Sequence, residues 1–150
     1  MQIDILTIFP RFFDEFLQHG MVRVARKQGQ VEISITDLRA FSEDRHRTVD
    51  DRPYGGGPGM LLKPEPVFRA LDLLGLKPGE APPDGTVPLL MCPRGRQLGQ
   101  GDLETFAGAQ RLVILCGRYE GYDERIVEAY PWQRVSLGDY VLSGGEVPAM

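Results

Sequence analysis

Cysteine is scarce in this sequence, and long runs of apolar residues are missing. Cys92 and Cys116 are the two cysteines, and neither belongs to a CxxC pair or accompanies a histidine pair. That spacing argues against a thiolate metal centre and a disulfide framework, so a reducing cytoplasm is the expected environment. The apolar start of the chain contains Asp4 and lacks a charged leader, and no apolar run is as long as a membrane span. We therefore expect no membrane association.

An excess of basic residues and the common nucleotide-binding motifs are missing as well. The 17 lysines and arginines are outnumbered by 21 aspartates and glutamates, which gives a net charge of −4. This balance argues against a sequence-indifferent polybasic nucleic-acid binder but leaves room for a local basic site. The chain has no GxxxxGK[ST] motif, and Gly55–Met60 does not fit GxGxxG. The two histidines suggest no Ser-His-Asp arrangement.

Hydrophobic periodicity predicts a single α/β domain. A chain of 150 residues with 42% hydrophobic residues is long enough for one core. Strands are predicted at 3–8, at 31–36 with one face more exposed to solvent, and at 87–91, 112–116 and 135–137. Helices are predicted over 10–19, 21–25, 64–74, 103–107 and 123–129. Because strands and helices alternate, we predict a mostly parallel sheet flanked by helices.

The most unusual segment is Asp44–Met60, where a charged stretch runs into four glycines and two prolines. Eight ionisable side chains occur within residues 43–52, a composition that suits neither a helix nor a strand. The glycines permit positive φ and close approach of main-chain amides to a ligand, while the prolines stiffen the path. We interpret the segment as a loop that holds a charged partner. A solvated linker is the alternative.

Three predicted strands are each followed by glycines and charged side chains. The segments are Met91–Arg96, Cys116–Arg125 and Leu137–Glu146. In an open α/β sheet, ligands bind beyond the carboxyl ends of the strands, so these segments are expected to converge on one site. A βα turn with a glycine cap is the alternative for any one of them.

In combination, Asp44–Met60, Cys116–Gly121 and Gly138–Glu146 closely resemble the motifs of the bacterial tRNA (guanine-37-N1)-methyltransferases, a family of the SPOUT class. The resemblance extends over the whole chain, from the Ile-Phe-Pro start to Met150. It implies an α/β SPOUT fold with a deep C-terminal trefoil knot, a homodimer, and a S-adenosylmethionine-binding domain that comprises residues 1–150. The family's C-terminal helical tRNA-binding domain is expected to be absent from this chain.

The resemblance also implies a reaction, in which S-adenosyl-L-methionine donates a methyl group to N1 of guanine 37, next to the anticodon of tRNA. By matching positions, the implied cofactor-binding residues are Leu90, Met91, Cys92, Pro93, Gly117, Tyr119, Glu120, Leu137, Gly138, Asp139, Tyr140, Val141, Leu142, Gly144 and Gly145. The residues expected to contact tRNA are Arg45, His46, Asp50, Arg52, Gly55, Gly56, Gly57 and Gly59, with Asp50 and Asp51 orienting the arginines.

Catalysis of this reaction needs a base that removes the N1 proton, and stabilisation of the charge that develops on O6. The family's base is an aspartate that we expect beyond Met150, so the catalytic residue is unknown and this chain alone is expected to be inactive. Glu120 is the candidate for an auxiliary role, either at the cofactor's ammonium group or in placing the Mg²⁺ that the family is understood to use. No metal-binding residue is assigned. The alternatives are a cofactor-binding dimerisation module that does not catalyse, and a nucleotide-binding protein unrelated to methylation.

Overall fold

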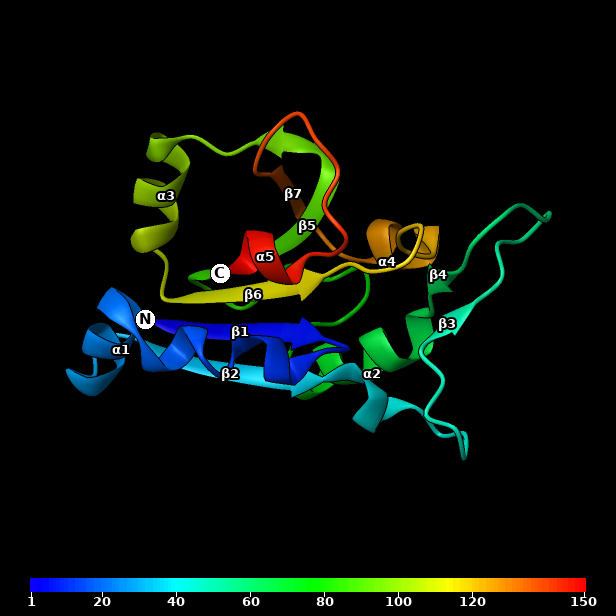
Figure 1. Cartoon of the computed structure of the whole chain (residues 1–150), viewed down its shortest axis with the longest axis horizontal. Helices are drawn as coiled ribbons and strands as arrows, with labels where there is room; N and C mark the ends of the chain where they lie inside the picture. The colour runs from blue at the N-terminus through cyan, green and yellow to red at the C-terminus, as the bar shows by residue number, and fades with distance from the viewer.

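A five-stranded, wholly parallel sheet forms the centre of the computed structural model, which describes residues 1–150 (Figure 1). The strands lie in the order β2-β1-β6-β5-β7, and every neighbouring pair is parallel. Their bounds are Gln2–Thr7 for β1, Glu32–Asp37 for β2, Thr86–Gln97 for β5, Arg111–Cys116 for β6 and Gln133–Ser136 for β7. The prediction of a mostly parallel sheet with flanking helices is confirmed.

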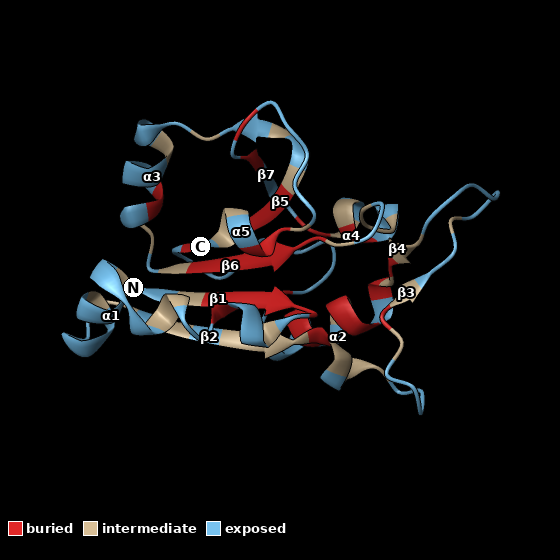
Figure 2. Cartoon of the chain, in the orientation of Figure 1, coloured by how far each residue is buried: buried red, intermediate tan, exposed pale blue.

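Helices cover both faces of the sheet, which explains why its central strands are apolar on both sides. Along β5, Leu90 packs into the core on one face, while Leu89 and Met91 pack into the core on the other. The first core is closed by α2 (Pro64–Leu73) and α4 (Glu124–Ala129), and the second by a 3₁₀ turn (Pro10–Phe13) and α3 (Gln100–Ala107). Figure 2 shows this burial concentrated in β1, β6 and α2.

The aromatic segment after β1 does not form the predicted helix over 10–19. It forms two 3₁₀ turns, Pro10–Phe13 and Phe16–Gln18, and α1 (Gly20–Lys27) begins at the glycine that was expected to interrupt the helix. The physical reason is packing, because Phe13 is fully buried whereas Phe12 is 48% exposed. Phe13 alone is fully buried, while Phe16 and Leu17 pack against the same core only in part, so the apolar stripe that a continuous helix would bury is weak.

Strand β5 is longer than predicted. Residues 92–96, expected to form a loop after the strand, remain in β5, which continues to Gln97. The register against β7 shifts between Met91 and Arg96, and both of these residues pair with Val135. The irregularity bends the strand at its carboxyl end, as bulges do near functional sites. A short helix that was not predicted, α5 (Glu146–Ala149), ends the chain.

A small hairpin forms at the base of the charged glycine segment. The prediction that the composition of this segment suits no strand is therefore wrong for Asp50–Asp51. Strand β3 (Asp50–Asp51) pairs antiparallel with β4 (Leu61–Leu62). The hairpin is anchored by the fully buried Val49 and Leu62. Residues 52–60, called the arm below, extend from this hairpin away from the sheet (Figure 1). None of the helices combines the length and apolar character that crossing a lipid bilayer requires.

A buried ion pair fixes the opposite, amino-terminal edge of the sheet. Asp4 is 2% exposed, and its Oδ2 lies 2.7 Å from Nε of Arg111 on the neighbouring strand β6. Nη1 of Arg111 also donates to the main-chain oxygen of Leu74, 2.8 Å away, after the end of α2. Breaking such a pair leaves a buried charge without compensation.

We predict that Arg111→Ala lowers the free energy of unfolding by about 3–5 kcal/mol, because the Asp4 carboxylate loses its partner. Urea denaturation measures the change. The matched control is Arg11→Ala, since Arg11 is 96% exposed in its ion pair with Asp14 and its loss should cost about 1 kcal/mol or less. Equal effects of the two substitutions would show that the buried pair has no special role.

Candidate active site at the strand ends

A cavity opens at the carboxyl ends of β5, β6 and β7, which are neighbours in the sheet. Its walls come from the three segments that were predicted to converge, although the first of them lies within β5; the convergence is confirmed. The lining comprises Met91, Cys92, Pro93, Arg94, Gly117, Arg118, Tyr119, Glu120, Gly121, Tyr122, Val135, Ser136, Leu137, Gly138, Tyr140, Val141, Leu142, Ser143, Gly144, Gly145 and Pro148.

A second, larger hollow is a weaker candidate for a specific polar ligand. It measures about 580 Å³ against about 190 Å³ for the strand-end cavity, and lies among α3, the sheet and the chain end at Met150. However, 18 of its 21 lining residues are hydrophobic. Ligand sites need a few convergent polar groups to fix orientation, and the strand-end cavity has them.

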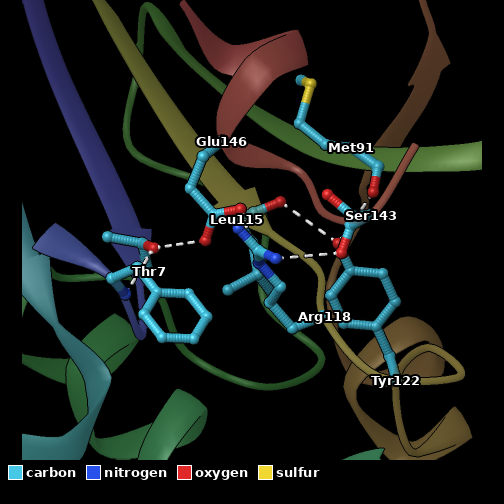
Figure 3. Close-up of polar contacts among 8 residues, drawn as sticks. Thr7, Met91, Leu115, Arg118, Tyr122, Ser143 and Glu146 are labelled. Atoms are coloured by element: carbon cyan, nitrogen blue, oxygen red, sulfur yellow. Dashed lines mark hydrogen bonds and ion pairs between the residues drawn. The ribbon is translucent and has the colours of Figure 1, made fainter. Parts of the chain in front are cut away.

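Tyr122 ties two of the strand ends together beneath the cavity (Figure 3). Its hydroxyl lies 2.9 Å from the main-chain oxygen of Met91, where the register of β5 shifts, and 3.2 Å from that of Leu115, next to the end of β6. Burial raises the pKa of Tyr122 well above its ordinary value, so the phenol stays neutral and acts as the donor. The floor of the cavity is therefore fixed by a buried hydrogen bond.

Glycine allows the third loop to approach the second at main-chain distance. The N–H of Gly145 donates to the oxygen of Gly117, 2.8 Å away. A Cβ on Gly145 would lie 2.6 Å from the Cα of Cys116, which no real structure tolerates. The approach brings α5 against the end of β6, and it places an acidic residue at the start of that helix inside the protein.

That acidic residue, Glu146, is fully buried and has a partner for each carboxylate oxygen (Figure 3). Oε1 accepts a hydrogen bond of 2.7 Å from the Thr7 hydroxyl, at the end of β1. Oε2 accepts one of 2.8 Å from Nε of Arg118. We call this pair of interactions the Glu146 network.

The main chain that crosses the cavity has free hydrogen-bonding groups. Neither the N–H nor the C=O groups of residues 139–142 take part in any hydrogen bond within the protein. Tyr140, Val141 and Leu142 in this stretch line the cavity. A ligand with donors and acceptors on one edge, such as a purine base, could pair with such a strip of main chain.

The arm is attached to the second loop of the cavity. The Tyr119 hydroxyl donates to Oδ1 of Asp50 over 3.2 Å, and the N–H of Glu120 donates to the oxygen of Met60 over 3.0 Å. Tyr119 has a φ of 61°, a left-handed conformation that is uncommon for a tyrosine, and these contacts hold it there. Burial, followed by the nearby Asp50, raises the pKa of Tyr119. Gly59 packs where a Cβ would overlap the Glu120 side chain.

The arginines of the charged segment have no carboxylate partners. Arg45, Arg47 and Arg52 form no ion pair, so the expectation that Asp50 and Asp51 orient them is wrong. Asp50 accepts from Tyr119 instead, and Asp51 accepts from the main-chain N–H of Arg52, 2.7 Å away.

The turn before the arm is organised by Asp44. It accepts from the hydroxyl of Ser42, the N–H of His46, and both the N–H and the hydroxyl of Thr48. These hydrogen bonds, Ser42 first, lower the pKa of Asp44. The turn thus has a defined shape while its basic side chains stay exposed.

The structure brings most of the predicted cofactor residues to the cavity, with two exceptions. Leu90 is 1% exposed and packs in the core instead, because alternate residues of β5 face opposite sides of the sheet. Asp139 is exposed and lies outside the lining. None of the residues predicted to contact tRNA lines the cavity; they lie on the segment beside it. Sequence reasoning assigned no role to Tyr122, Ser143 or Glu146, although Glu146 was visible as a charge directly after two glycines.

Comparisons with known proteins agree with this geometry. A protein from Moorella thermoacetica, described as tRNA (guanine-N(1)-)-methyltransferase, is 46% identical over 100% of this chain, and one of the same description from Koribacter versatilis is 50% identical over 98% of it. This chain spans 59% and 55% of the lengths of these two relatives. The crystal structure of the tRNA (m1G37) methyltransferase from Aquifex aeolicus superposes with a TM-score of 0.85 at 39% identity, covering 99% of this chain and 65% of that one.

The family model described as tRNA (Guanine-1)-methyltransferase TrmD matches residues 1–150. A match over the full sequence agrees with the identities of 46% and 50% to the two relatives and with the shared fold. The chain belongs to the tRNA (guanine-1)-methyltransferase family.

Proposed function

We propose that this chain binds S-adenosyl-L-methionine in the strand-end cavity and is the cofactor-binding part of an enzyme that methylates N1 of guanine 37 in tRNA. The observation that carries the proposal is the strip of unpaired main-chain groups at residues 139–142, which borders a cavity built from three strand ends. The relatives' description as tRNA (guanine-N(1)-)-methyltransferases supports the choice of reaction.

The residues present fit the cofactor by their chemistry. When bound, S-adenosyl-L-methionine supplies a methyl group on a sulfonium sulfur, which the guanine nitrogen can attack. Main-chain groups of residues 139–142 are available to an adenine edge, and Leu137 and Leu142 add apolar surface to the lining. Glu120 is exposed beside the cavity and offers a carboxylate to the cofactor's ammonium group or to Mg²⁺.

The charged segment is suited to hold the RNA. Arg45, Arg47 and Arg52 are exposed and unpaired, so they are free to contact phosphates. Gly55, Gly56 and Gly57 at the tip of the arm have positive φ and open space around them, so main chain can come close to a nucleotide. Hydrogen bonds from Tyr119 and Glu120 connect the base of the arm to the cavity, which supports an RNA site next to the cofactor site.

We place the general base beyond Met150, in the part of the relatives that this chain does not span. Asp50 is bonded to Tyr119, and Asp139 lies outside the cavity, so neither is poised to take the N1 proton. Removal of a proton by a positioned base contributes about 10²–10⁴-fold to a rate. Residues 1–150 alone are therefore expected to be inactive, and robust methyl transfer by them would contradict this placement.

The same proposal includes the assembly and the location. It comprises the trefoil knot, a two-fold homodimer whose sites border the partner, a helical tRNA-binding domain in the longer protein, and a cytoplasmic location. A symmetric pair of this kind buries the same patch on both subunits. Sedimentation that detects only monomer at micromolar concentration would contradict the dimer.

For the cofactor, we predict that the chain binds S-adenosylhomocysteine, the demethylated product, and that Gly138→Val weakens binding more than tenfold, about 1.4 kcal/mol. Gly138 is buried in the lining, and a Cβ there would lie 2.5 Å from the Tyr140 ring, so a branched side chain must displace this ring, which itself lines the cavity. Calorimetry measures the affinity. Gly101→Val is the matched control, because position 101 has open space on α3 and binding should be unchanged. Full affinity of the Gly138→Val variant would remove the assignment.

For the arm, we predict that Arg52→Ala in the full-length protein weakens tRNA binding and lowers the dependence of binding on salt by about one unit of slope, the effect of one lost phosphate contact. Affinity for S-adenosylhomocysteine should stay unchanged. Arg23→Ala is the control, because Arg23 is exposed on α1 at the other end of the sheet. Equal loss of tRNA and cofactor binding in Arg52→Ala would mean that the arm is only structural.

A further inference from the structure

The Glu146 network joins three separate parts of the chain. The N–H of Phe9 donates to the Thr7 hydroxyl over 3.0 Å, and this hydroxyl donates to Oε1 of Glu146. On the other side, Nε of Arg118 donates to Oε2, and Nη1 of the same guanidinium donates to the oxygen of Ser143 over 3.0 Å. The carboxylate thus connects the end of β1, the loop after β6 and the loop that carries residues 139–142 (Figure 3).

Arg118 is held in one orientation by these contacts. Its planar guanidinium has Nε committed to Glu146 and Nη1 to Ser143, a fork that a lysine ammonium could not reproduce. The ring of Phe9 covers it, with a distance of 4.6 Å from Cζ to the ring centroid. The arginine side chain is 17% exposed; its bond to Glu146 is partly buried, whereas its bond to Ser143 lies at the surface.

Stability alone is a poor reason for such an arrangement. A buried ion pair loses the hydration of both charges, and apolar residues of similar volume often give equal or greater stability. What the pair supplies is a unique geometry. Through its second hydrogen bond, Arg118 also fixes the position of Ser143. Ser143 directly follows the strip of unpaired main-chain groups that borders the cavity.

We infer that Glu146 is a positioning residue for cofactor binding: it orients Arg118, which holds the Ser143 carbonyl and so fixes the loop of residues 139–144 before the cofactor arrives. A loop ordered in advance spares the ligand the entropy cost of ordering it. The inference rests on the proposed function, because it assigns this loop to the cofactor.

The test replaces Glu146 by glutamine, which keeps the shape but removes the charge. Calorimetry with S-adenosylhomocysteine should show an affinity loss of about tenfold or more. In the unliganded protein, hydrogen exchange of the Gly145 amide, which anchors the end of this loop by its bond to the Gly117 oxygen, should become faster. This rate is called the loop exchange below. Arg118→Lys should reproduce both effects, because one ammonium cannot reach both acceptors, and this variant decides the matter if Glu146→Gln does not fold.

A double-mutant cycle separates positioning from general damage. If Glu146 acts through Arg118, Glu146→Gln should change affinity by less than about twofold when Arg118 is already alanine, since coupled residues are non-additive. Asp4→Asn is the matched control: it makes the same carboxylate-to-amide change in the other buried ion pair, on the same strand as Thr7. It should lower stability and leave both cofactor affinity and loop exchange unchanged.

Two results would overturn the inference. One is wild-type affinity and wild-type loop exchange in Glu146→Gln or Arg118→Lys; the other is additive losses in the cycle. Failure of the proposed function is distinguishable, because an unmodified chain that binds no S-adenosylhomocysteine refutes the cofactor assignment. In that case, loop exchange in the unliganded variants still decides whether Glu146 fixes the loop.

Discussion

The parallel pairing of β5 with both β6 and β7 is the constraint on which the rest of the structure depends. Parallel strands have their carboxyl ends at one edge of the sheet, so three loops that are distant in sequence must meet there. Helices pack on both faces of the sheet, and the cavity opens at this edge. The cavity is thus a consequence of the strand order and not of any one motif.

Polar contacts beneath the cavity hold the three loops in a defined arrangement. The Tyr122 hydroxyl joins β5 to β6, and the N–H of Gly145 donates to the oxygen of Gly117. The Glu146 network extends from β1 to Ser143. Except for the exposed bond from Arg118 to Ser143, these contacts are buried or partly buried, where an unmade hydrogen bond is expensive. The loops above them can therefore leave their own main-chain groups unpaired and available to a ligand.

The arm is attached to the same edge of the sheet as the cavity. Its base is bonded to Tyr119 and Glu120 of the cavity, while its tip extends into open space (Figure 1). This arrangement places the exposed Arg52 beside the cavity without making it part of the wall. In the proposed reaction, the methyl group and the nucleotide must meet at one point, and the shared base of arm and cavity provides the alignment.

Much of this account could be predicted from the sequence, because it depends on local pattern. The apolar runs at 87–91 and 112–116 predict parallel strands buried on both faces, and glycines with charges after three strands predict the convergence of their loops. The structure departs from prediction where long-range packing decides. The aromatic segment that anchors Phe13 is not one helix, and β5 continues past Met91 because β7 offers it a shifted register.

The Glu146 network lay beyond sequence reasoning for the same reason. Thr7 and Glu146 are separated by 139 positions, and only the fold shows that they share a hydrogen bond. Periodicity could not exclude Leu90 from the cavity either, since it does not say which face of a strand borders the site. RNA contact by the arginines of the charged segment stays a prediction. Their lack of ion pairs could not be predicted, because it depends on Asp50 and Asp51 accepting hydrogen bonds from other groups in the fold.

The central claim is that the cofactor binds at the strand ends, against the loop of residues 139–144. Amide NMR spectra of the isotope-labelled chain, titrated with S-adenosylhomocysteine, test it most directly. The account predicts saturable shifts at Gly117 and throughout residues 137–145, with little change in the arm at residues 52–59. Shifts confined to the apolar hollow beside α3, or no shifts at saturating ligand, would contradict it.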